Sequence, residues 1–504
     1  MELKRRPDIS IPVSVSKPTR VCIPLCEPNL TAVQSADWME WRIDCFENEL
    51  TDLSAFLNNI SVPVIVTFRP AEQGGYRKLT REEREAFWKT QAPRGESVWW
   101  DVEADIAEQV APEWSRTIVS HHDFNGVPND LDQIYAQLAQ TPARVLKIAV
   151  QADDVVECIP VFQLLDRARS EGREIIAIAM GNAGIATRIL GPSRGSFLTY
   201  GALDEESATA PGQINARSLR SVYHVDTIDE ETMICGLVGM PAMHSVSPHM
   251  HNTAFMSERI NGVYLPFEVK DIETFFKRMV HPRTREIDWN LRGLSITAPH
   301  KETVMNSIDW IDPEAANIGA VNTIVVEKDH LRGYNTDTTG FMNPLRRLID
   351  SYVDLEVAVI GAGGAARAAI WALKRYGANV TLFARDPAKA QSLAEFFNIQ
   401  CNPLASASFA SYGLVVNATP LGSGAYVDQT PATRDQLKGA RIAFDMVYNP
   451  METKFLQEAR IAGCETVLGL EMLVGQARIQ FELWTHRKFL GSSIMYEAAA
   501  AALG

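Results

Sequence analysis

Residues 38–44 read Trp-Met-Glu-Trp-Arg-Ile-Asp, with apolar and charged side chains in alternation. Successive side chains of a β-strand point to opposite faces, so the apolar residues from Met39 to Ile43 share one face and Glu40 and Arg42 share the other. If helices cover the apolar face, the two charged side chains point into a closed barrel. Burying a charge costs several kcal/mol unless the charge is paired with an opposite charge or serves in binding or catalysis. The alternation therefore predicts an inward face that carries chemistry.

Seven further apolar runs surround this strand. Helical patterns separate them, which favours βα units with parallel strands, and eight such units in about 200 residues fit a (β/α)8 barrel. A doubly wound open sheet is the alternative. The same alternation at 145–150 points Lys147 inward beside the smaller Val145 and Ala149, so we expect a lone lysine in the barrel core. The runs lie at 21–25, 62–68, 97–103, 117–123, 145–150, 174–180 and 196–203.

The second half of the chain also alternates strands and helices. Its pattern implies two αβ lobes. Residues 215–230 contain no strand and no strong apolar period, so we expect them to connect the two halves. The apolar runs lie at 234–239, 262–269, 291–298 and 322–328, then at 357–369 with many glycines, and at 379–385, 413–419 and 442–448.

Charge and hydropathy exclude several classes of protein. The 504 residues include 48 Lys and Arg and 62 Asp and Glu, a net charge of −14. This charge gives no general attraction for nucleic acid or an anionic membrane. No apolar run approaches the roughly 18 residues of a spanning helix. The basic start, MELKRRPDIS, is not followed by the apolar core of a secretory signal, so we expect a cytoplasmic protein.

The cysteines and histidines do not form a recognisable metal or disulfide pattern. Seven cysteines are scattered and lack paired CxxC spacing, which excludes a disulfide scaffold and a zinc site. His244, His249 and His251 lie close together in sequence, but no carboxylate or cysteine accompanies them. We therefore expect no metal.

Five side chains of the first half fall at or just beyond the predicted strand ends, where barrel enzymes place their sites. An apolar surround lowers the pKa of a lysine, and the neutral amine of Lys147 could then attack a carbonyl and form a Schiff base. His122 could act beside it as general base or acid. A core lysine held by salt bridges is the structural alternative. The other three are Arg42, Arg69 and Arg188.

These motifs together resemble type I 3-dehydroquinate dehydratase. The matching segments, in order, are 40–44, 67–75, 120–124, 147–149, 180–188 and 209–213. The resemblance implies that Lys147 forms an imine with the ketone of 3-dehydroquinate, and that His122 removes a proton and helps water leave, giving 3-dehydroshikimate. It also implies that Arg188 binds the substrate carboxylate. The hydroxyls would be held by Glu40, Arg42, Arg69, Thr209 and Gln213. Gln73 and Thr209 stand where the family usually has glutamate and serine.

The glycine-rich stretch of the second half predicts a dinucleotide site. Gly361-Ala-Gly363-Gly364-Ala365-Ala366 follows a strand and opens a helix, where backbone N–H groups can approach a pyrophosphate. The next strand ends at Arg385. In dinucleotide-binding folds, an arginine at this strand end binds the 2′-phosphate of NADP, whereas an acid binds the ribose 2′-hydroxyl of NAD. Arg385 and Lys389 favour NADP, whereas Asp386 favours NAD.

The motifs around this stretch resemble shikimate dehydrogenase over residues 233–490. The resemblance implies Lys301 and Asp337 as the catalytic pair. A lysine ammonium can stabilise and protonate the alkoxide that hydride transfer creates, while a carboxylate holds it. The implied substrate residues are Ser245, Ser247, Thr297, Asn322, Tyr448 and Gln476. The implied cofactor residues include Thr419, Gly469 and Met472. Ala384 and Asp386 depart from the family's asparagine and threonine.

The two resemblances together imply a bifunctional shikimate-pathway enzyme that makes shikimate with NADPH, as a monomer or simple homodimer. We expect an extension at 1–20, a barrel at 21–214, a connector at 215–230, a substrate lobe at 231–340 completed by helices at about 475–504, and a Rossmann lobe at 341–474. One alternative is an NAD-preferring quinate or shikimate dehydrogenase. Another is a non-catalytic regulator built from these domains, which would lack the lysines or carry a DNA-binding segment.

Overall fold

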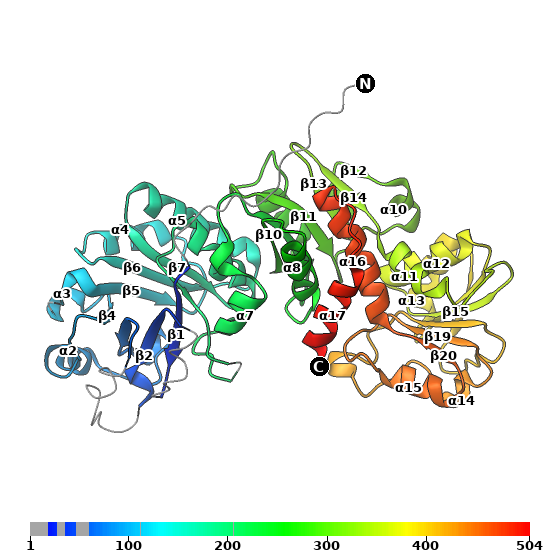
Figure 1. Cartoon of the computed structure of the whole chain (residues 1–504), viewed down its shortest axis with the longest axis horizontal. Helices are drawn as coiled ribbons and strands as arrows, with labels where there is room; N and C mark the ends of the chain where they lie inside the picture. The colour runs from blue at the N-terminus through cyan, green and yellow to red at the C-terminus, as the bar shows by residue number, and fades with distance from the viewer. Residues whose placement is uncertain (1–18, 28–35, 47–59, 111, 205) are drawn as a thin grey trace.

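The computed structural model describes residues 19–27, 36–46, 60–110, 112–204 and 206–504. Most of the predicted extension at 1–20 lies outside them. The described residues form three sheets, an eight-stranded one followed by two six-stranded ones. Figure 1 shows the first sheet at one end of the molecule and the third at the other.

The first sheet is the predicted barrel. Its strands pair in parallel in the order β7-β6-β5-β4-β3-β2-β1-β8. Ile175 of β7 and Ser196, just before β8, form a parallel bridge that brings the two edges together. The strands are β1 (Val21–Leu25), β2 (Trp38–Arg42), β3 (Val64–Thr67), β4 (Val98–Glu103), β5 (Thr117–Asp123), β6 (Val145–Gln151), β7 (Glu174–Met180) and β8 (Thr199–Tyr200).

The predicted alternation along β2 and β6 is confirmed. Met39 and Trp41 belong to the apolar cluster between strands and helices, and Glu40 and Arg42 are buried on the opposite face. Lys147 is likewise buried inside the barrel. A separate apolar cluster closes the barrel interior below these charged residues, and it contains Cys22, Trp38, Ile65, Trp99, Ile118, Val145, Ile176, Ile178, Phe197, Leu198 and Tyr200.

The barrel helices pack on the outside of this sheet. They include α2 (Arg81–Thr90), α3 (Ala107–Val110), α4 (Leu131–Ala139), α5 (Ile159–Ser170), α6 (Ile185–Leu190) and α7 (Ala216–Ser221). Helix α7 lies in the stretch that we predicted as a connector. It contacts β1, and a Cβ on Gly201 would lie 2.8 Å from Ala216 Cα. Residues 215–230 therefore also cover the barrel, and the helix escaped prediction because it is only six residues long.

The second sheet forms a lobe in the middle of the chain, called here the middle lobe. Its strands lie in the order β10-β9-β11-β13-β14-β12, and β13 runs antiparallel to both of its neighbours. The strands are β9 (Met233–Gly239), β10 (Gly262–Glu268), β11 (Leu291–Ile296), β12 (Trp310–Ile311), β13 (Thr323–Val326) and β14 (Leu331–Tyr334). Its helices are α8 (Ser247–Ser257), α9 (Ile272–Phe275), α10 (Pro313–Ile318) and α11 (Asp337–Leu345).

The last two helices return to the middle lobe. Helix α16 (Gly469–Thr485) contacts β11 and β13, and α17 (Ser492–Leu503) contacts α8. Both lie beside α8 in Figure 1. Their buried residues, such as Leu470, Phe481 and Trp484, share one apolar cluster with Met233 and Tyr264 of the sheet. The chain therefore completes this lobe only at its end.

The third sheet is entirely parallel and has the strand order of a dinucleotide-binding fold, β17-β16-β15-β18-β19-β20. It forms the Rossmann lobe. Its strands are β15 (Glu356–Ile360), β16 (Asn379–Ala384), β17 (Gln400–Pro403), β18 (Leu414–Asn417), β19 (Ile442–Asp445) and β20 (Glu465–Val467). Its helices are α12 (Gly364–Arg375), α13 (Pro387–Phe397), α14 (Arg434–Leu437) and α15 (Lys454–Ile461).

The barrel and the middle lobe contact each other through the segments that follow β6 and β7. Lys270 N donates a 2.7 Å hydrogen bond to Asp154 Oδ2, and Arg194 donates to the backbone oxygen of Asp288. Apolar residues of both units belong to one buried cluster. Among the described residues, no helix is both long and apolar enough to cross a bilayer.

Candidate active sites

One cavity, of about 40 Å³, opens at the ends of the barrel strands. It brings together every barrel residue that the sequence singled out, from strands β2, β5 and β6, from helix α6 and from the loops that hold Arg69, Thr209 and Gln213. The residues that line it are Glu40, Arg42, Arg69, Gly74, His122, Phe124, Lys147, Ala149, Ile178, Met180, Arg188, Tyr200, Thr209, Ala210 and Gln213. Lys147 and His122 lie on the neighbouring strands β6 and β5. The cavity is therefore a candidate active site with a lysine at its floor.

The surround of Lys147 is not apolar, and that expectation was wrong. Its Nζ donates hydrogen bonds to Asp101 Oδ2 at 2.7 Å, Tyr200 Oη at 2.9 Å and Glu40 Oε1 at 3.3 Å. These partners come from β4, β8 and β2, none of which pairs with β6, so the alternation along β6 alone does not reveal them. Three oxygens thus hold the amine in one place beside the cavity. Thr67 in turn donates to Glu40 Oε1 at 2.7 Å and fixes that carboxylate.

Asp101 and Glu103 of β4 are site residues that the sequence reasoning missed. Asp101 also accepts a 2.7 Å hydrogen bond from Arg69. Burial raises the pKa of Asp101, but Lys147 and Arg69 outweigh burial and lower it to about 2. Burial raises the pKa of Glu103 to about 8. The alternation test applied to 98–103 would have found both carboxylates, because they share the inward face of Trp99.

His122 has the electrostatics of a base. Burial holds its pKa well below the usual range of histidine, and the nearby cations of Arg69 and Lys147 lower it further. The imidazole is therefore neutral near pH 7. Its Nδ1 is buried and has no hydrogen-bond partner within the described part of the chain. A neutral imidazole with a free nitrogen at the cavity can accept a proton from a bound molecule.

Arg188 is a buried cation with no carboxylate beside it among the residues described. Its Nη2 donates to Pro211 O at 3.3 Å, and its Nε has no partner. Burial lowers the pKa of Arg188 to about 10. An unpaired buried guanidinium is costly, and an anionic ligand in the cavity would supply the missing charge.

The loop at 70–77 covers the cavity from the side of β2 and β3. Arg42 Nη2 donates to Gly74 O at 2.9 Å and to Asp44 Oδ2 at 2.7 Å. Gly74 adopts a φ of +82° and lies so close to Phe124 that a Cβ would fall 2.2 Å from the ring. The neighbouring Gln73 has a buried Oε1 without a partner among the described residues. Only glycine permits this closure at position 74.

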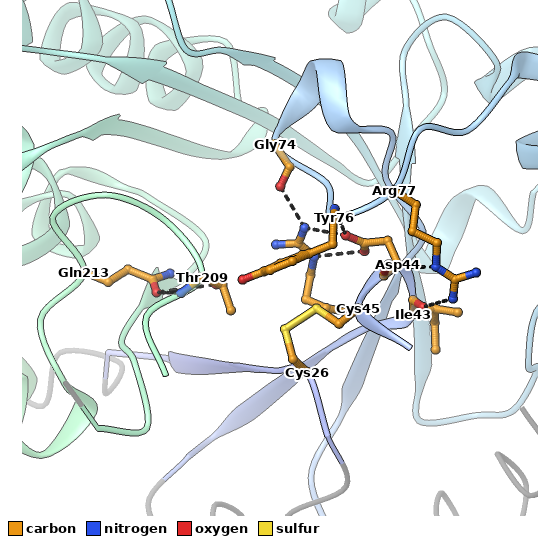
Figure 2. Close-up of a disulfide and its surroundings, with 10 residues drawn as sticks. Cys26, Ile43, Asp44, Cys45, Gly74, Tyr76, Arg77, Thr209 and Gln213 are labelled. Carbon is orange, nitrogen blue, oxygen red and sulfur yellow. Dashed lines mark hydrogen bonds and ion pairs between the residues drawn. A yellow bond between two sulfur atoms is a disulfide. The ribbon is translucent and has the colours of Figure 1, made fainter. Parts of the chain in front are cut away.

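Thr209 and Gln213 lie on the opposite rim. Thr209 N donates to Gln213 Oε1 at 2.8 Å, and Gly181 N donates to Pro211 O at 3.1 Å, which ties this rim to the end of β7. Figure 2 shows Tyr76 of the covering loop extending towards this pair. The threonine that replaces the usual serine keeps a hydroxyl at the rim.

A disulfide joins Cys26 and Cys45 beside this site (Figure 2). The sequence analysis excluded a scaffold of disulfides and did not predict this pair. Cys26 follows β1 directly and Cys45 ends the short helix η2 (Ile43–Cys45) after β2. The two residues are 19 positions apart and become neighbours only because β1 and β2 pair in register.

A second, larger cavity of about 850 Å³ lies between the middle lobe and the Rossmann lobe. It contains every predicted substrate residue of the second half, together with Lys301 and Asp337. Of the predicted cofactor residues, Ala365, Gly469 and Met472 line it. The predicted substrate residues in its lining are Ser245, Ser247, Thr297, Asn322, Tyr448 and Gln476.

Lys301 and Asp337 form the ion pair that the resemblance implies. Lys301 Nζ lies 2.5 Å from Asp337 Oδ2, and Asn322 Nδ2 donates to Asp337 Oδ1 at 2.8 Å. The Asp337 backbone N–H donates to Asn335 Oδ1 at 3.1 Å. Asp337 is also the first residue of α11, where the positive end of the helix favours its negative charge. The carboxylate therefore orients the ammonium towards the cavity.

A buried hydrogen-bond network supports this pair, and the sequence reasoning missed it. Asn322 Oδ1 accepts from Thr336 N at 2.8 Å and from Thr323 Oγ1 at 2.7 Å. Gln480 of α16 donates to Thr323 Oγ1 at 3.0 Å and accepts from Ser295 Oγ at 2.8 Å. Gln480 lies four residues after Gln476, which places it on the same helix face and was the available signal.

The wall of the cavity formed by α8 carries hydroxyl groups. Ser245 Oγ donates to Ser247 Oγ at 3.0 Å, at the start of the helix. Tyr448, from the loop after β19, adds a phenol whose pKa is raised by burial. Such a wall suits a ligand with several hydroxyls.

The glycine-rich loop between β15 and α12 fits a dinucleotide. Gly361 has a φ of +111°, and a Cβ there would lie 2.8 Å from Ala418 O. A Cβ on Gly363 would meet nothing within 4 Å, so the backbone before α12 is open to a ligand. The N-terminal end of α12 supplies N–H groups and positive potential for a phosphate. A Cβ on Gly364 would lie 3.0 Å from the Lys301 side chain, so this loop reaches the Lys301–Asp337 ion pair.

Arg385 follows β16 at the edge of the same loop. It is exposed and makes no ion pair or hydrogen bond within the part of the chain that the structure describes. Asp386 is the residue that favours NAD. Its Oδ2 lies 3.9 Å from Lys389 Nζ, so the negative charge of this carboxylate is paired with the lysine. Thr419 donates to Asn417 Oδ1 at 2.7 Å and lies against Gly361. These residues leave a free guanidinium where a 2′-phosphate would lie.

His244, which precedes α8, and His249 and His251 of α8 do not converge on one point. His251 is fully buried and stacks on Tyr264, with ring centroids 4.3 Å apart, whereas His244 lines the large cavity. Within the described ranges, no group of three or more His, Cys, Asp or Glu side chains is placed to hold a metal ion.

Comparison with known proteins agrees with this geometry. Residues 25–230 match the family model for type I 3-dehydroquinase, residues 237–324 match the shikimate dehydrogenase substrate binding domain, and residues 469–499 match the shikimate 5′-dehydrogenase C-terminal domain. A chloroplastic bifunctional 3-dehydroquinate dehydratase/shikimate dehydrogenase of Arabidopsis thaliana is 33% identical over 511 residues, covering 94% of this chain and 83% of the relative. The chain belongs to the bifunctional 3-dehydroquinate dehydratase/shikimate dehydrogenase family.

Relatives of the dehydrogenase half are also found alone. An NADP(+) shikimate dehydrogenase of Caldanaerobacter subterraneus is 37% identical over 280 residues, which cover 54% of this chain and 97% of the relative. A crystal structure of a shikimate dehydrogenase in complex with NADP+ superimposes with a TM-score of 0.51 at 31% identity, covering 55% of this chain and 98% of that one. In this bifunctional family, the barrel corresponds to the dehydratase half and the other two lobes to the dehydrogenase half.

Proposed function

We propose that the barrel dehydrates 3-dehydroquinate to 3-dehydroshikimate and that the second half reduces this product to shikimate with NADPH. Both reactions belong to the shikimate pathway, which supplies aromatic amino acid biosynthesis. The observation that carries the proposal is the placement of Lys147 and His122 in one cavity with Arg188, a buried guanidinium that has no carboxylate partner among the described residues. The fusion keeps the intermediate near the second site.

In the dehydratase half, the Lys147 amine attacks the ketone carbon of the substrate, and loss of water gives an imine. His122, neutral near pH 7, then removes a proton from the adjacent carbon, and the imine takes up the electron pair. The protonated His122 assists departure of the hydroxyl as water, and hydrolysis of the imine restores the amine. Arg188 pairs with the substrate carboxylate throughout. Glu40, Arg42, Arg69, Thr209 and Gln213 hold the remaining groups.

In the dehydrogenase half, the ketone of 3-dehydroshikimate lies beside Lys301. The ammonium stabilises negative charge on the oxygen as it becomes an alcohol, and Asp337 keeps it aimed. The substrate is bound by Ser245, which precedes α8, and by Ser247, Thr297, Asn322, Tyr448 and Gln476. NADPH supplies the hydride when it is bound. The open backbone at Gly363 would hold its pyrophosphate, and Arg385 would hold its 2′-phosphate.

A product assay tests both reactions. Purified protein with 3-dehydroquinate and NADPH should accumulate shikimate. Borohydride with the dehydratase ligand should trap a covalent adduct on Lys147, and Lys147→Ala should stop only the first step. The exposed Lys89→Ala is the matched control and should form shikimate normally. An adduct that persists in Lys147→Ala would overturn the Schiff-base assignment.

Cofactor and substrate preference separate this proposal from an NAD-linked quinate dehydrogenase. Asp386 is the feature that favours the alternative, but its carboxylate faces Lys389. Activity with NADPH should exceed activity with NADH on shikimate-pathway substrates. A strong preference for NADH and quinate would contradict the proposal.

Location and assembly complete the proposal. We expect the chain to act in the cytoplasm, although the Arabidopsis relative is chloroplastic. We expect a monomer or simple homodimer that needs no nucleic acid or membrane. Fractionation of the native host and the mass of the protein in solution would test these two expectations.

A further inference from the structure

The Cys26–Cys45 disulfide lies where two neighbouring barrel strands end. The Cα atoms of Cys26 and Cys45 are 5.2 Å apart. Because β1 and β2 run in parallel, both cysteines lie on the face where the barrel carries its cavity. The bond therefore ties the end of β2 to the end of β1 at the rim of the dehydratase site.

The residue before Cys45 links this bond to the cavity. Asp44 is fully buried and accepts two hydrogen bonds from Arg42, at 3.1 and 2.7 Å. It also accepts one from the Tyr76 backbone N–H at 3.1 Å, and its own carbonyl accepts from Arg77 Nε at 3.1 Å. Figure 2 shows these contacts around Asp44, next to the sulfur bridge. Asp44 thus holds one cavity residue and the covering loop together.

The covering loop transmits the position of Asp44 to the cavity. Its ends are closed by hydrogen bonds from Ala71 N to Arg77 O and from Gly75 N to Pro70 O, so it shifts as a unit. Gly74 at its tip lies against Phe124 and lines the cavity. A displacement of residues 43–45 would therefore move this lining and Arg42, whereas Lys147 and His122 lie on strands farther round the barrel.

These two cysteines are also more accessible than four of the other five. Cys26 and Cys45 are both partly exposed. Cys22, Cys158 and Cys235 are buried, and burial raises the pKa of each thiol. Because the Cys26–Cys45 disulfide is partly exposed, an external dithiol can reach its sulfur atoms and exchange with them.

We propose that the Cys26–Cys45 pair is a thiol-exchange site whose redox state sets substrate affinity in the dehydratase half. A thiolate of an external dithiol attacks one sulfur and releases the other cysteine as a thiol. The second donor thiol then displaces the first cysteine. The S–S bond breaks, the chain gains two electrons and two protons, and the donor becomes a disulfide. Reduction frees Asp44 from β1 and loosens its hold on Arg42 and Tyr76.

Reduction should change KM of the dehydratase more than it changes kcat. This kinetic test rests on the proposed dehydratase function. Reduction with dithiothreitol should raise KM for 3-dehydroquinate about threefold or more, equivalent to part of one hydrogen bond to a charged group. The value of kcat should change less, because the groups that react are not tied to the bridge. The dehydrogenase activity of the same sample should stay constant. Reoxidation with glutathione disulfide should restore KM.

Variants separate this effect from general damage. Cys26→Ser should have the high KM in both redox states and no response to the dithiol. Cys401→Ser, at another partly exposed cysteine, should respond as the unmodified protein does. If Cys26→Ser fails to fold, which its dehydrogenase activity reports, the reversible treatment of the unmodified protein still decides the question.

Two measurements need no dehydratase activity and so distinguish failure of this inference from failure of the proposed function. Alkylation followed by mass spectrometry should find Cys26 and Cys45 blocked before reduction and labelled after it. Amide hydrogen exchange at Tyr76 should accelerate on reduction. The inference is overturned if both cysteines resist oxidation by glutathione disulfide, or if the bridge forms and breaks with neither exchange at Tyr76 nor KM responding.

Discussion

Lys147 Nζ and Asp101 Oδ2 lie 2.7 Å apart in the interior of the barrel, on strands that are separated by β5. Both side chains are almost fully buried, so the pair is shielded from solvent. Asp101 also faces Arg69, which makes it the shared anion of two cations. The amine that we propose as nucleophile is therefore positioned by a carboxylate rather than by an apolar pocket.

Asp101→Asn should test this anchoring. The change leaves two buried cations with less negative charge nearby, and removing one partner of a buried pair costs about 3–5 kcal/mol. The amide keeps some hydrogen bonding, so we expect the free energy of unfolding to fall by an amount near the lower end of this range. We also expect a lower kcat of the dehydratase. Chemical unfolding and imine trapping measure the two effects. The control is Asp132→Asn, whose side chain is 82% exposed; equal losses in both variants would contradict the prediction.

The pH dependence of the dehydratase should reflect His122. Its pKa is lowered by burial and by neighbouring cations, so the imidazole remains neutral below pH 6.5 and protonates only as the pH falls further. The acid limb of kcat/KM, which reports groups of the free enzyme, should therefore have its midpoint below 6.5. A midpoint at or above 6.5 that disappears in His122→Gln would contradict this.

The same shift has a consequence for stability. A histidine whose pKa is depressed on folding binds its proton more readily when unfolded, so the protein loses stability as the pH falls below the unfolded value near 6.5. His122→Gln should remove this contribution. Urea unfolding at pH 7.5 and pH 5.5 measures it, and the difference between the two pH values should shrink in the variant.

Arg188→Gln should separate binding from folding. Hydrogen bonds to charged groups contribute about 1.5–3 kcal/mol, so KM for 3-dehydroquinate should rise about 10- to 100-fold. Folding should not suffer to the same degree, because the variant removes a buried cation that has no carboxylate partner among the described residues. Steady-state kinetics measures the rise in KM, and urea unfolding of the same preparation measures the change in the free energy of unfolding. A parallel loss of stability and affinity would mean that Arg188 is structural.

The sequence revealed more of the chemistry than of its supporting contacts. Alternation within one strand predicted that Glu40 and Lys147 point inward, because that property is local. The partners of Lys147 lie on β2, β4 and β8, and they meet the lysine only because the closed barrel brings non-adjacent strands together, which a single strand does not show. The Cys26–Cys45 bridge has the same origin, since 19 residues separate two cysteines that strand pairing brings together. Helix α7 was missed because six residues give too short an apolar period.

The two lobes of the dehydrogenase half are linked beside Lys301, the lysine that we propose as catalytic. Arg367 of α12 lies 2.9 Å from Glu302, the residue after Lys301. Arg367→Gln should shift the lobes towards an open state and raise KM for NADPH about two- to fivefold, the range of a partly exposed ion pair. Arg375→Gln is the matched control, because its 3.9 Å contact with Glu314 also joins the lobes but is more exposed and farther from the lysine. Equal effects would refute a specific link.

Cofactor choice should depend on Arg385. Its guanidinium has no partner among the residues that the structure describes, and it lies at the end of β16, where the 2′-phosphate of NADPH would lie. NADH lacks that phosphate. Arg385→Ala should therefore raise KM for NADPH about tenfold or more, the value of one charge-assisted contact, and leave KM for NADH nearly unchanged. Arg434→Ala, at an exposed arginine on the same lobe, should change neither value. If Arg385→Ala raises both Michaelis constants equally, the arginine supports the loop rather than the phosphate, and NADP preference must come from elsewhere in the lobe.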